Sequence, residues 1–182
     1  MILPMRRCLI VVDYQNDFVS GSLGFEKARG LEKNIASKID EYRKNGDEII
    51  FTLDTHGEDY LKTREGRFLP VEHCIKGTDG HCLYGEVANY ADEKDLYFEK
   101  STYGSDALYE YLKKNEYKSI ELCGVVSNIC VISNAVLAKT AQPETEIYVD
   151  ALCTASNDDS LNFAALSVMD SLQIEVKNRE NI

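Results

Sequence analysis

The amino-acid sequence predicts an α/β fold, a doubly wound three-layer α/β/α sandwich around a six-stranded, mostly parallel sheet. Six short apolar segments alternate with amphipathic segments along the 182 residues. The first, from Arg7 to Asp13, has a continuous apolar interior, as expected for a strand that is buried on both faces. Strands that alternate with helices imply right-handed crossovers and a parallel sheet with helices on both sides.

Hydrophobic spacing then defines the elements of the first half of the chain. After the first strand, apolar residues recur at helical intervals, and Gly46 is a natural end for this helix. This apolar stripe consists of Leu31, Ile35, Ile39 and Tyr42. Glu48 to Leu53 is predicted as the second strand, which ends at Asp54. Residues 55–94 are rich in glycine, proline and polar side chains, and we expect them to be irregular.

The same alternation continues in the second half of the chain. We predict strands at 96–98, 119–123, 146–149 and 174–176, and helices at 106–114, 129–139 and 161–172. No repeat, low-complexity tract or linker interrupts this pattern. We therefore expect one globular domain that covers residues 1–182.

Composition excludes several classes of partner. Hydrophobic residues make up 44% of the chain and charged residues 28%, which is typical of a globular domain. The net charge of −11 argues against nucleic acid or an anionic membrane as a partner. No apolar run approaches the roughly 20 residues that a membrane-spanning helix needs. We expect a cytoplasmic protein.

One of the six cysteines stands in a distinctive place. Cys130 follows the apolar strand at 119–123 and a short turn, near the predicted start of the next helix. A helix N-terminus favours a thiolate, which is the nucleophilic form of cysteine, and its N–H groups can hold an oxyanion. The alternative is a buried cysteine that acts as a small apolar side chain. The spacings contain no C-x-x-C pair and do not suggest a disulfide framework.

Polar residues follow the ends of several predicted strands. Asp13, Asp54, Lys100 and the turn before Cys130 should therefore converge at one edge of the sheet, where α/β folds bind ligands. Asp13 can take a proton from the thiol, and Lys100 can stabilise both anions and lower the pKa of the thiol. As alternatives, Asp13 caps the following turn, Asp17 replaces it as the active carboxylate, and Lys100 is an ordinary surface lysine.

A second group of residues has the chemistry of a metal site. Asp54 and His56 alternate at the end of a strand, and Glu65 and His73 follow in the next segment. Imidazole and carboxylate ligands suit Zn²⁺, Fe²⁺ or Mn²⁺. In one alternative the two histidines are only hydrogen-bonded loop residues. In another, a structural zinc ion is bound by the neighbouring residues His73, Cys74, His81 and Cys82.

Five segments in order along the chain resemble the isochorismatase-like cysteine hydrolases, and among them the metal-dependent nicotinamidases. These segments are 12–18 (VDYQNDF), 52–56 (TLDTH), 98–105 (FEKSTYGS), 123–131 (CGVVSNICV) and 150–156 (DALCTAS). The last of them resembles the loop that follows the fifth strand in that family. The resemblance extends over nearly the whole chain.

The resemblance implies a catalytic centre and a backbone feature. It implies that Asp13, Lys100 and Cys130 form a catalytic triad. It also implies a cis peptide bond between Val125 and Val126, and an oxyanion hole formed by the backbone N–H groups of Val126 and Cys130.

The resemblance also implies ligands and partners. The metal ligands would be Asp54, His56, Glu65 and His73, and they would hold one divalent ion, Zn²⁺ in the first place and Fe²⁺ or Mn²⁺ otherwise. Phe18 and Tyr103 would contact the pyridine ring of a small carboxamide substrate. Family members often form homo-oligomers, and we expect the same of this chain.

These features together imply a nicotinamidase. Such an amidohydrolase converts nicotinamide to nicotinate and ammonia through a thioester on cysteine, a reaction of NAD salvage. One alternative is another cysteine hydrolase of this fold that acts on a different small amide or on isochorismate. A second is a binding protein that keeps the fold without catalysis. A nucleotide-binding module is disfavoured, because no glycine-rich phosphate loop follows Asp13.

Overall fold

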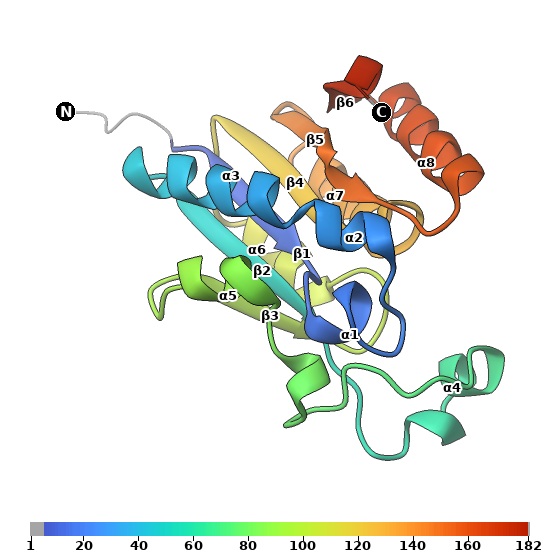
Figure 1. Cartoon of the computed structure of the whole chain (residues 1–182). Coiled ribbons are helices and arrows are strands. Elements are labelled where there is room, and N and C mark those ends of the chain that lie inside the picture. Colours follow the sequence, from blue (N-terminus) through green and yellow to red (C-terminus); the bar gives the residue numbers. More distant parts are fainter. Residues whose placement is uncertain (1–5, 182) are drawn as a thin grey trace.

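The computed structural model describes residues 6–181 and has one six-stranded parallel sheet as its centre (Figure 1). The strands are β1 (Cys8–Val12), β2 (Glu48–Asp54), β3 (Leu96–Lys100), β4 (Ser119–Val125), β5 (Glu146–Ala155) and β6 (Ile174–Lys177). They lie in the order β3-β2-β1-β4-β5-β6, and every neighbouring pair is parallel. The predicted fold class is confirmed.

Helices cover both faces of this sheet. The helices of residues 6–181 are α1 (Asn16–Val19), α2 (Glu26–Gly30), α3 (Glu32–Lys44), α4 (Arg64–Phe68), α5 (Gly85–Tyr90), α6 (Asp106–Leu112), α7 (Ile132–Ala141) and α8 (Asp159–Ser171). On one face of the sheet lie α2, α3 and α5, and on the other lie α6, α7 and α8, whereas α4 lies away from the sheet (Figure 1). Single 3-10 turns lie at Tyr60–Lys62, Asp79–His81 and Arg179–Asn181, and a π-helical turn lies at Ser127–Val131. No helix among residues 6–181 is long and apolar enough to cross a membrane.

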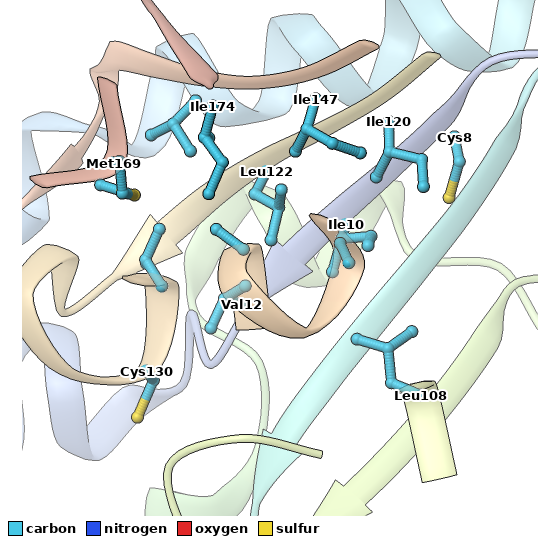
Figure 2. Close-up of a cluster of buried hydrophobic side chains, with 14 of the residues drawn as sticks. Cys8, Ile10, Val12, Leu108, Ile120, Leu122, Cys130, Ile147, Met169 and Ile174 are labelled. Carbon is cyan, nitrogen blue, oxygen red and sulfur yellow. The ribbon is translucent and has the colours of Figure 1, made fainter. Parts of the chain in front are cut away.

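The central strand β1 supplies the core on both sides of the sheet. Its five residues are fully buried, and their side chains alternate between the two faces. Ile10 joins a cluster with Leu122 and Met169 under α6, α7 and α8 (Figure 2). Leu9 joins a second cluster with Phe51 under α2, α3 and α5. Because β1 is apolar on both faces, it holds the sheet in the middle of the molecule.

Two expectations about the elements need correction. Residues 55–94 are not wholly irregular, because α4, α5 and two 3-10 turns lie among them. These elements are three to six residues long, too short to show a helical stripe in the sequence. The predicted helix at 129–139 begins later, at Ile132, after the π-helical turn.

The strand predicted at 146–149 is also longer than expected. β5 continues to Ala155, so the segment that resembles a loop after the fifth strand belongs to the sheet itself. The strand bulges there, and residues 150–153 stand opposite the single residue Cys123 of β4. Lys38 of α3 ion-pairs with both Asp150 and Glu121 at 2.8 Å, which allows a carboxylate to lie inside the strand.

Candidate active site

The carboxyl edge of the sheet brings together the first group of predicted residues. Asp13 follows β1, Lys100 ends β3, and Cys130 lies in the π-helical turn after β4. Lys100 Nζ lies 2.6 Å from Asp13 Oδ2 and 3.6 Å from Cys130 Sγ. All three residues are at most 6% exposed, so Lys100 is no surface lysine. The hydroxyl of Thr52 on β2 donates to Asp13 Oδ1 at 2.6 Å and fixes the carboxylate from the other side.

The electrostatics of these three groups differ from the expectation. Burial raises the pKa of the Cys130 thiol, and Asp13 raises it further, whereas Lys100 lowers it. Lys100 thus acts in the expected direction, but the net shift is upward and the expected thiolate is not favoured, because removal from water outweighs the one nearby cation. Burial also raises the pKa of Asp13, although Lys100 opposes this effect. The pKa of Lys100 rises despite burial, because Asp13, Cys130 and Asp54 surround it.

The turn that carries Cys130 depends on a close approach of two strands. Gly124 has a φ of 107°, and a Cβ placed there would stand 2.1 Å from the carbonyl oxygen of Val12. Only glycine fits this position. The peptide bond between Val125 and Val126 is cis, as the family resemblance implies. The carbonyl of Val126 then accepts hydrogen bonds from the amides of Ile129 and Val131, which closes the turn.

The second group of predicted residues also lies together. His56 Nε2 lies 3.0 Å from Asp54 Oδ2, and His73 Nε2 lies 3.4 Å from the same oxygen. The ligand atoms of Asp54, His56 and His73 all lie within 4.8 Å of one another, and all three residues are buried. His73 directs Nδ1 to the carbonyl of Val71 at 2.8 Å, which leaves Nε2 free to face the cluster. Two imidazole nitrogens and a carboxylate oxygen are a suitable donor set for Zn²⁺ or Fe²⁺.

Glu65 lies at the rim of this cluster. Its Oε1 is 3.9 Å from His56 Nε2 and 3.8 Å from His73 Nε2. Glu65 enters the site from α4, whose first turn is capped by Thr63 through a hydrogen bond from the amide of Gly66. The structure therefore places Glu65 beside the other three residues but outside the tight group that they form.

The two groups touch each other through one lysine. Lys100 Nζ lies 3.4 Å from Asp54 Oδ1, while Asp54 Oδ2 faces the histidines. Burial alone would raise the pKa of Asp54, but hydrogen bonds with His56 and His73 and the charge of Lys100 lower it. Asp54 is therefore a permanent anion. It belongs to the metal-type cluster, which consists of Asp54, His56 and His73, and it also faces the triad of Asp13, Lys100 and Cys130.

The other expected residues have separate positions. A cleft of about 900 Å³ opens beside His56 and Glu65, and Tyr103 and Phe68 also line it. Phe18 is buried and packs against the His73 ring, with centroids 5.4 Å apart, and it does not line this cleft. The buried triad of Asp13, Lys100 and Cys130 likewise does not line the cleft.

Asp17 does not replace Asp13 beside Lys100 and Cys130. Its Oδ2 accepts a hydrogen bond from the amide of Cys74 at 2.8 Å, and Oδ1 accepts one from the amide of Ser22. It therefore fixes the chain next to His73. The alternative zinc site is not formed either, because His81 Nε2 is hydrogen-bonded to Thr55 and the Cys82 side chain is exposed. Within residues 6–181, only Asp54, His56 and His73 are grouped closely enough to hold a metal ion.

Sequence reasoning gave no role to Gln15, which the structure places at the centre of the site's support. Gln15 is fully buried. Its Nε2 donates to the carbonyls of Asp54 and His81 at 2.9 and 2.8 Å, and its Oε1 accepts from the amide of Asp54 at 2.8 Å. It thereby fixes both backbone groups of a candidate metal ligand. The available signal was its place two residues after Asp13, in the polar segment that ends the first strand.

Comparisons with known proteins agree with this architecture. The sequence profile of the isochorismatase domain matches residues 7–180. An isochorismatase family protein of Bacillus subtilis, PncA, is 35% identical over 143 residues, which cover 72% of this chain and 78% of that protein.

Solved structures give the same result. The crystal structure of nicotinamidase/pyrazinamidase PncA from Bacillus subtilis has a TM-score of 0.84 and 31% identity, and the match covers 94% of this chain and 99% of that one. The pyrazinamidase of Pyrococcus horikoshii in complex with zinc has a TM-score of 0.82 and 25% identity, with coverage of 94% and 98%. With a profile that spans nearly its whole length, the chain belongs to the isochorismatase family.

Proposed function

We propose that this hydrolase is a nicotinamidase, which converts nicotinamide to nicotinate and ammonia. The observation that carries the proposal is the contact between the two groups of residues. Lys100 touches Asp13, Cys130 and Asp54, so a thiol, its proton acceptor and a metal-type cluster share one edge of the sheet. Relatives described as nicotinamidases, from Saccharomyces cerevisiae and Mycobacterium tuberculosis, support the choice of substrate.

The first half of the reaction follows from the order of the side chains. Because the pKa of the Cys130 thiol is raised, the sulfur rests protonated and passes its proton to Asp13 as it attacks the carboxamide carbon. The backbone N–H groups of Val126 and Cys130 receive the negative charge that develops on the carboxamide oxygen. Asp13 then protonates the nitrogen, the C–N bond breaks, and ammonia leaves a thioester on Cys130.

The second half of the reaction regenerates the thiol. Asp13 accepts a proton from water, whose oxygen attacks the thioester carbon. The C–S bond then breaks, and nicotinate leaves as the sulfur of Cys130 regains a proton. Lys100 keeps its proton throughout, since three anionic or polar neighbours raise its pKa, and it serves as the fixed countercharge.

The buried cluster of Asp54, His56 and His73 fits a divalent ion, and we assign Glu65 as a further ligand. When bound, Zn²⁺, or Fe²⁺ or Mn²⁺ in its place, would supply a Lewis acid that takes the pyridine nitrogen of the substrate. Tyr103, at the edge of the cleft, would contact the pyridine ring, and Phe18 would support it from behind His73.

The biological setting is part of the same proposal. A nicotinamidase returns nicotinamide to the synthesis of NAD, and we place this activity in the cytoplasm. We also propose that residues 1–182 act as one domain, in agreement with a family profile that matches residues 7–180.

Ammonia release from nicotinamide by the purified chain tests this function. We expect the Cys130→Ala variant to lose turnover while its folding and metal content stay normal. Cys8→Ala is the matched control, because Cys8 is also buried but lies at the start of β1, at the end of the strand opposite to Asp13. A wild-type chain that releases no ammonia, or a Cys130→Ala variant with substantial activity, would contradict the proposal.

The size of the cleft favours a second candidate within the same chemistry. Its volume of about 900 Å³ lies in the range of sites for drug-sized ligands. A cysteine hydrolase for a larger amide would therefore also fit. A panel of amides in the same assay separates the two candidates, since a higher kcat/KM for a larger amide would favour the second.

A further inference from the structure

We propose that Asn134 is a positioning residue for the hydrolysis proposed above, and the proposal rests on that function. Asn134 lies in the first turn of α7 and is fully buried. Its task is to hold the nucleophile, Cys130, in a fixed position relative to Tyr103, which lines the cleft. Asn134 acts through these two residues and has no part in the chemical steps themselves.

The side-chain amide of Asn134 joins two segments that are distant in the sequence. Its Nδ2 donates to the carbonyl of Cys130 at 2.8 Å and to the carbonyl of Tyr103 at 3.1 Å. Its Oδ1 accepts a hydrogen bond from the amide of Ser105 at 3.0 Å. A buried amide needs such partners to compensate for its removal from water. Here both donor hydrogens are used, and they go to backbone groups of two residues that we assign to the site.

The segment that carries Tyr103 depends on this contact. Residues 101–104 are irregular and connect β3 to α6. Within the part of the chain that the structure describes, their backbone makes no hydrogen bond except the one from Asn134. The segment also lies close to α7, because a Cβ added to Gly104 would stand 2.8 Å from a leucine side chain of that helix. Asn134 therefore fixes one wall of the cleft against α7.

The nucleophile is held by the same side chain. Cys130 lies in the π-helical turn that precedes α7, and Asn134 reaches back to its carbonyl from four residues further along. Lys100, which lies 3.6 Å from the sulfur, ends β3 and directly precedes the cleft wall. A shift of this wall relative to α7 would therefore move both the cation beside the sulfur and the proposed ring contact. A misplacement of about 1 Å can slow a reaction about a hundredfold.

Gln142, at the other end of α7, is a buried amide of purely structural character. It donates to the carbonyls of Leu112 and Asn115 and accepts a hydrogen bond from the hydroxyl of Thr145. None of these partners belongs to the triad, the metal-type cluster or the cleft. Gln142 and Asn134 thus have similar hydrogen bonds on one helix, and they differ in what their partners carry.

Steady-state kinetics of nicotinamide hydrolysis test the proposed role. Asn134→Leu keeps the branching of the side chain but removes its hydrogen bonds, and we expect kcat to fall and KM to rise, each on the order of tenfold. Gln142→Leu should lose comparable stability in urea but keep both constants within about twofold of the wild-type values. Unchanged constants in Asn134→Leu, or equal changes in the two leucine variants, would overturn the proposal.

The Asn134→Thr variant separates the two contacts. A threonine hydroxyl within a helix can donate to the carbonyl four residues earlier, which is that of Cys130, but it is too short to bridge to Tyr103. We therefore expect kcat to return toward the wild-type value while KM stays raised, because the nucleophile is held again and the cleft wall is not. A kcat as low as that of Asn134→Leu would contradict the role assigned to the bond with Cys130.

Hydrogen exchange measured by NMR distinguishes a failure of this proposal from a failure of the proposed function. The amide of Ser105 loses its acceptor in Asn134→Leu, so it should exchange at least about tenfold faster than in the wild-type chain and in Gln142→Leu. A wild-type chain that releases no ammonia would remove the proposed function and, with it, the role of Asn134 in that reaction. An unchanged exchange rate at Ser105, with ammonia still released, would overturn the positioning role alone.

Discussion

Lys100 is the residue that joins the two halves of the site. Its ammonium group lies within 4 Å of a carboxylate on each side and of the sulfur of Cys130. Without this cation, Asp13 and Asp54 would be two buried carboxylates with no shared positive partner, and the pKa of Asp13 would rise. A protonated Asp13 cannot accept the thiol proton.

The Lys100→Met variant tests this dependence. We expect kcat/KM for nicotinamide to fall by at least about a hundredfold, because the proton acceptor is lost from its charged form. We also expect the free energy of unfolding to fall by about 3 kcal/mol, because buried carboxylates lose their partner. Lys76→Met, which removes a lysine paired with Glu99 at the surface, should change neither quantity. Wild-type activity in Lys100→Met would contradict the assigned role.

Gln15 supports the metal-type cluster from the backbone side, and its replacement should weaken metal binding. In Gln15→Leu, the amide and carbonyl of Asp54 lose their partners, and we expect the affinity for Zn²⁺ to fall by about 10- to 100-fold. Competition with a chromophoric chelator measures this affinity without any assay of activity.

A second buried glutamine provides the control for this variant. Gln142 donates hydrogen bonds to the carbonyls of Leu112 and Asn115. Gln142→Leu should cost comparable stability and leave the affinity for Zn²⁺ unchanged. Equal zinc affinities in the two leucine variants would show that Gln15 has no special part in the site.

At the scale of elements, the bulge in β5 depends on a charge cluster that spans the chain. Asp150 in β5 and Glu121 in β4 both ion-pair with Lys38 of α3, and Asn178 donates to Asp150 at 2.8 Å. Burial alone would raise the pKa of Asp150, but the hydrogen bonds from Asn178 and Lys38 lower it. The charged form of Asp150 therefore stabilises the fold.

This cluster predicts a pH dependence of stability. Because the pKa of Asp150 is lower in the folded chain than the value of about 3.9 in the unfolded chain, its contribution is complete above that value. It is lost as the pH falls through the folded pKa. We expect Asp150→Asn to reduce the free energy of unfolding in urea by about 2 kcal/mol at neutral pH, and the difference should shrink at acidic pH.

A surface carboxylate gives the control for this measurement. Asp40 pairs with Lys44 on the surface of α3, so Asp40→Asn should change stability by less than about 1 kcal/mol. A difference between Asp150→Asn and the wild-type chain that stays constant between neutral and acidic pH would contradict the argument.

The sequence predicted the strands well where burial is local and complete. β1 is apolar throughout, and its alternation with the stripe of α3 led directly to a parallel sheet. The predicted end of β5 was wrong because a carboxylate such as Asp150 usually ends a buried strand. Here Lys38, which is distant in the sequence, pairs with Asp150 and stabilises it inside the strand. The local sequence around Asp150 gives no sign of such a distant partner.

In the candidate site too, features that follow from strand order were predictable, whereas features that depend on distant contacts were not. Parallel strands end at one edge, so Asp13, Asp54 and Lys100 were correctly expected to meet there. The direction of the thiol pKa shift was wrong, since it depends on how deeply Cys130 is buried, which its local sequence does not specify. Gln15 was given no role because its partners are backbone groups, which its place two residues after Asp13 does not reveal.

At the scale of the whole molecule, the metal-type cluster links segments that the sheet alone does not hold. His73 belongs to the long segment between β2 and β3, and its ring packs against Phe18 of α1. An ion bound by Asp54, His56 and His73 would therefore tie this segment to the sheet. Ligands that bind only the folded state raise its stability by mass action.

Metal removal should consequently be visible in thermal unfolding. At a free Zn²⁺ concentration about a hundredfold above its dissociation constant, we expect the stability to rise by about 2.7 kcal/mol. For a chain of this size the midpoint should then rise by about 5–10 °C relative to the same protein in chelator. His73→Ala should show no response, and an equal response in that variant would place the metal elsewhere.

The unequal accessibility of the thiols bears on how the nucleophile should be labelled. Among the cysteines of residues 6–181, Cys82 alone is exposed, whereas Cys130 is 5% exposed. An alkylating reagent would therefore modify Cys82 first, and a covalent adduct would not by itself report on catalysis. In a Cys82→Ser background, the first adduct seen by mass spectrometry should lie on the sulfur of Cys130. The enzyme should lose its activity as this adduct forms.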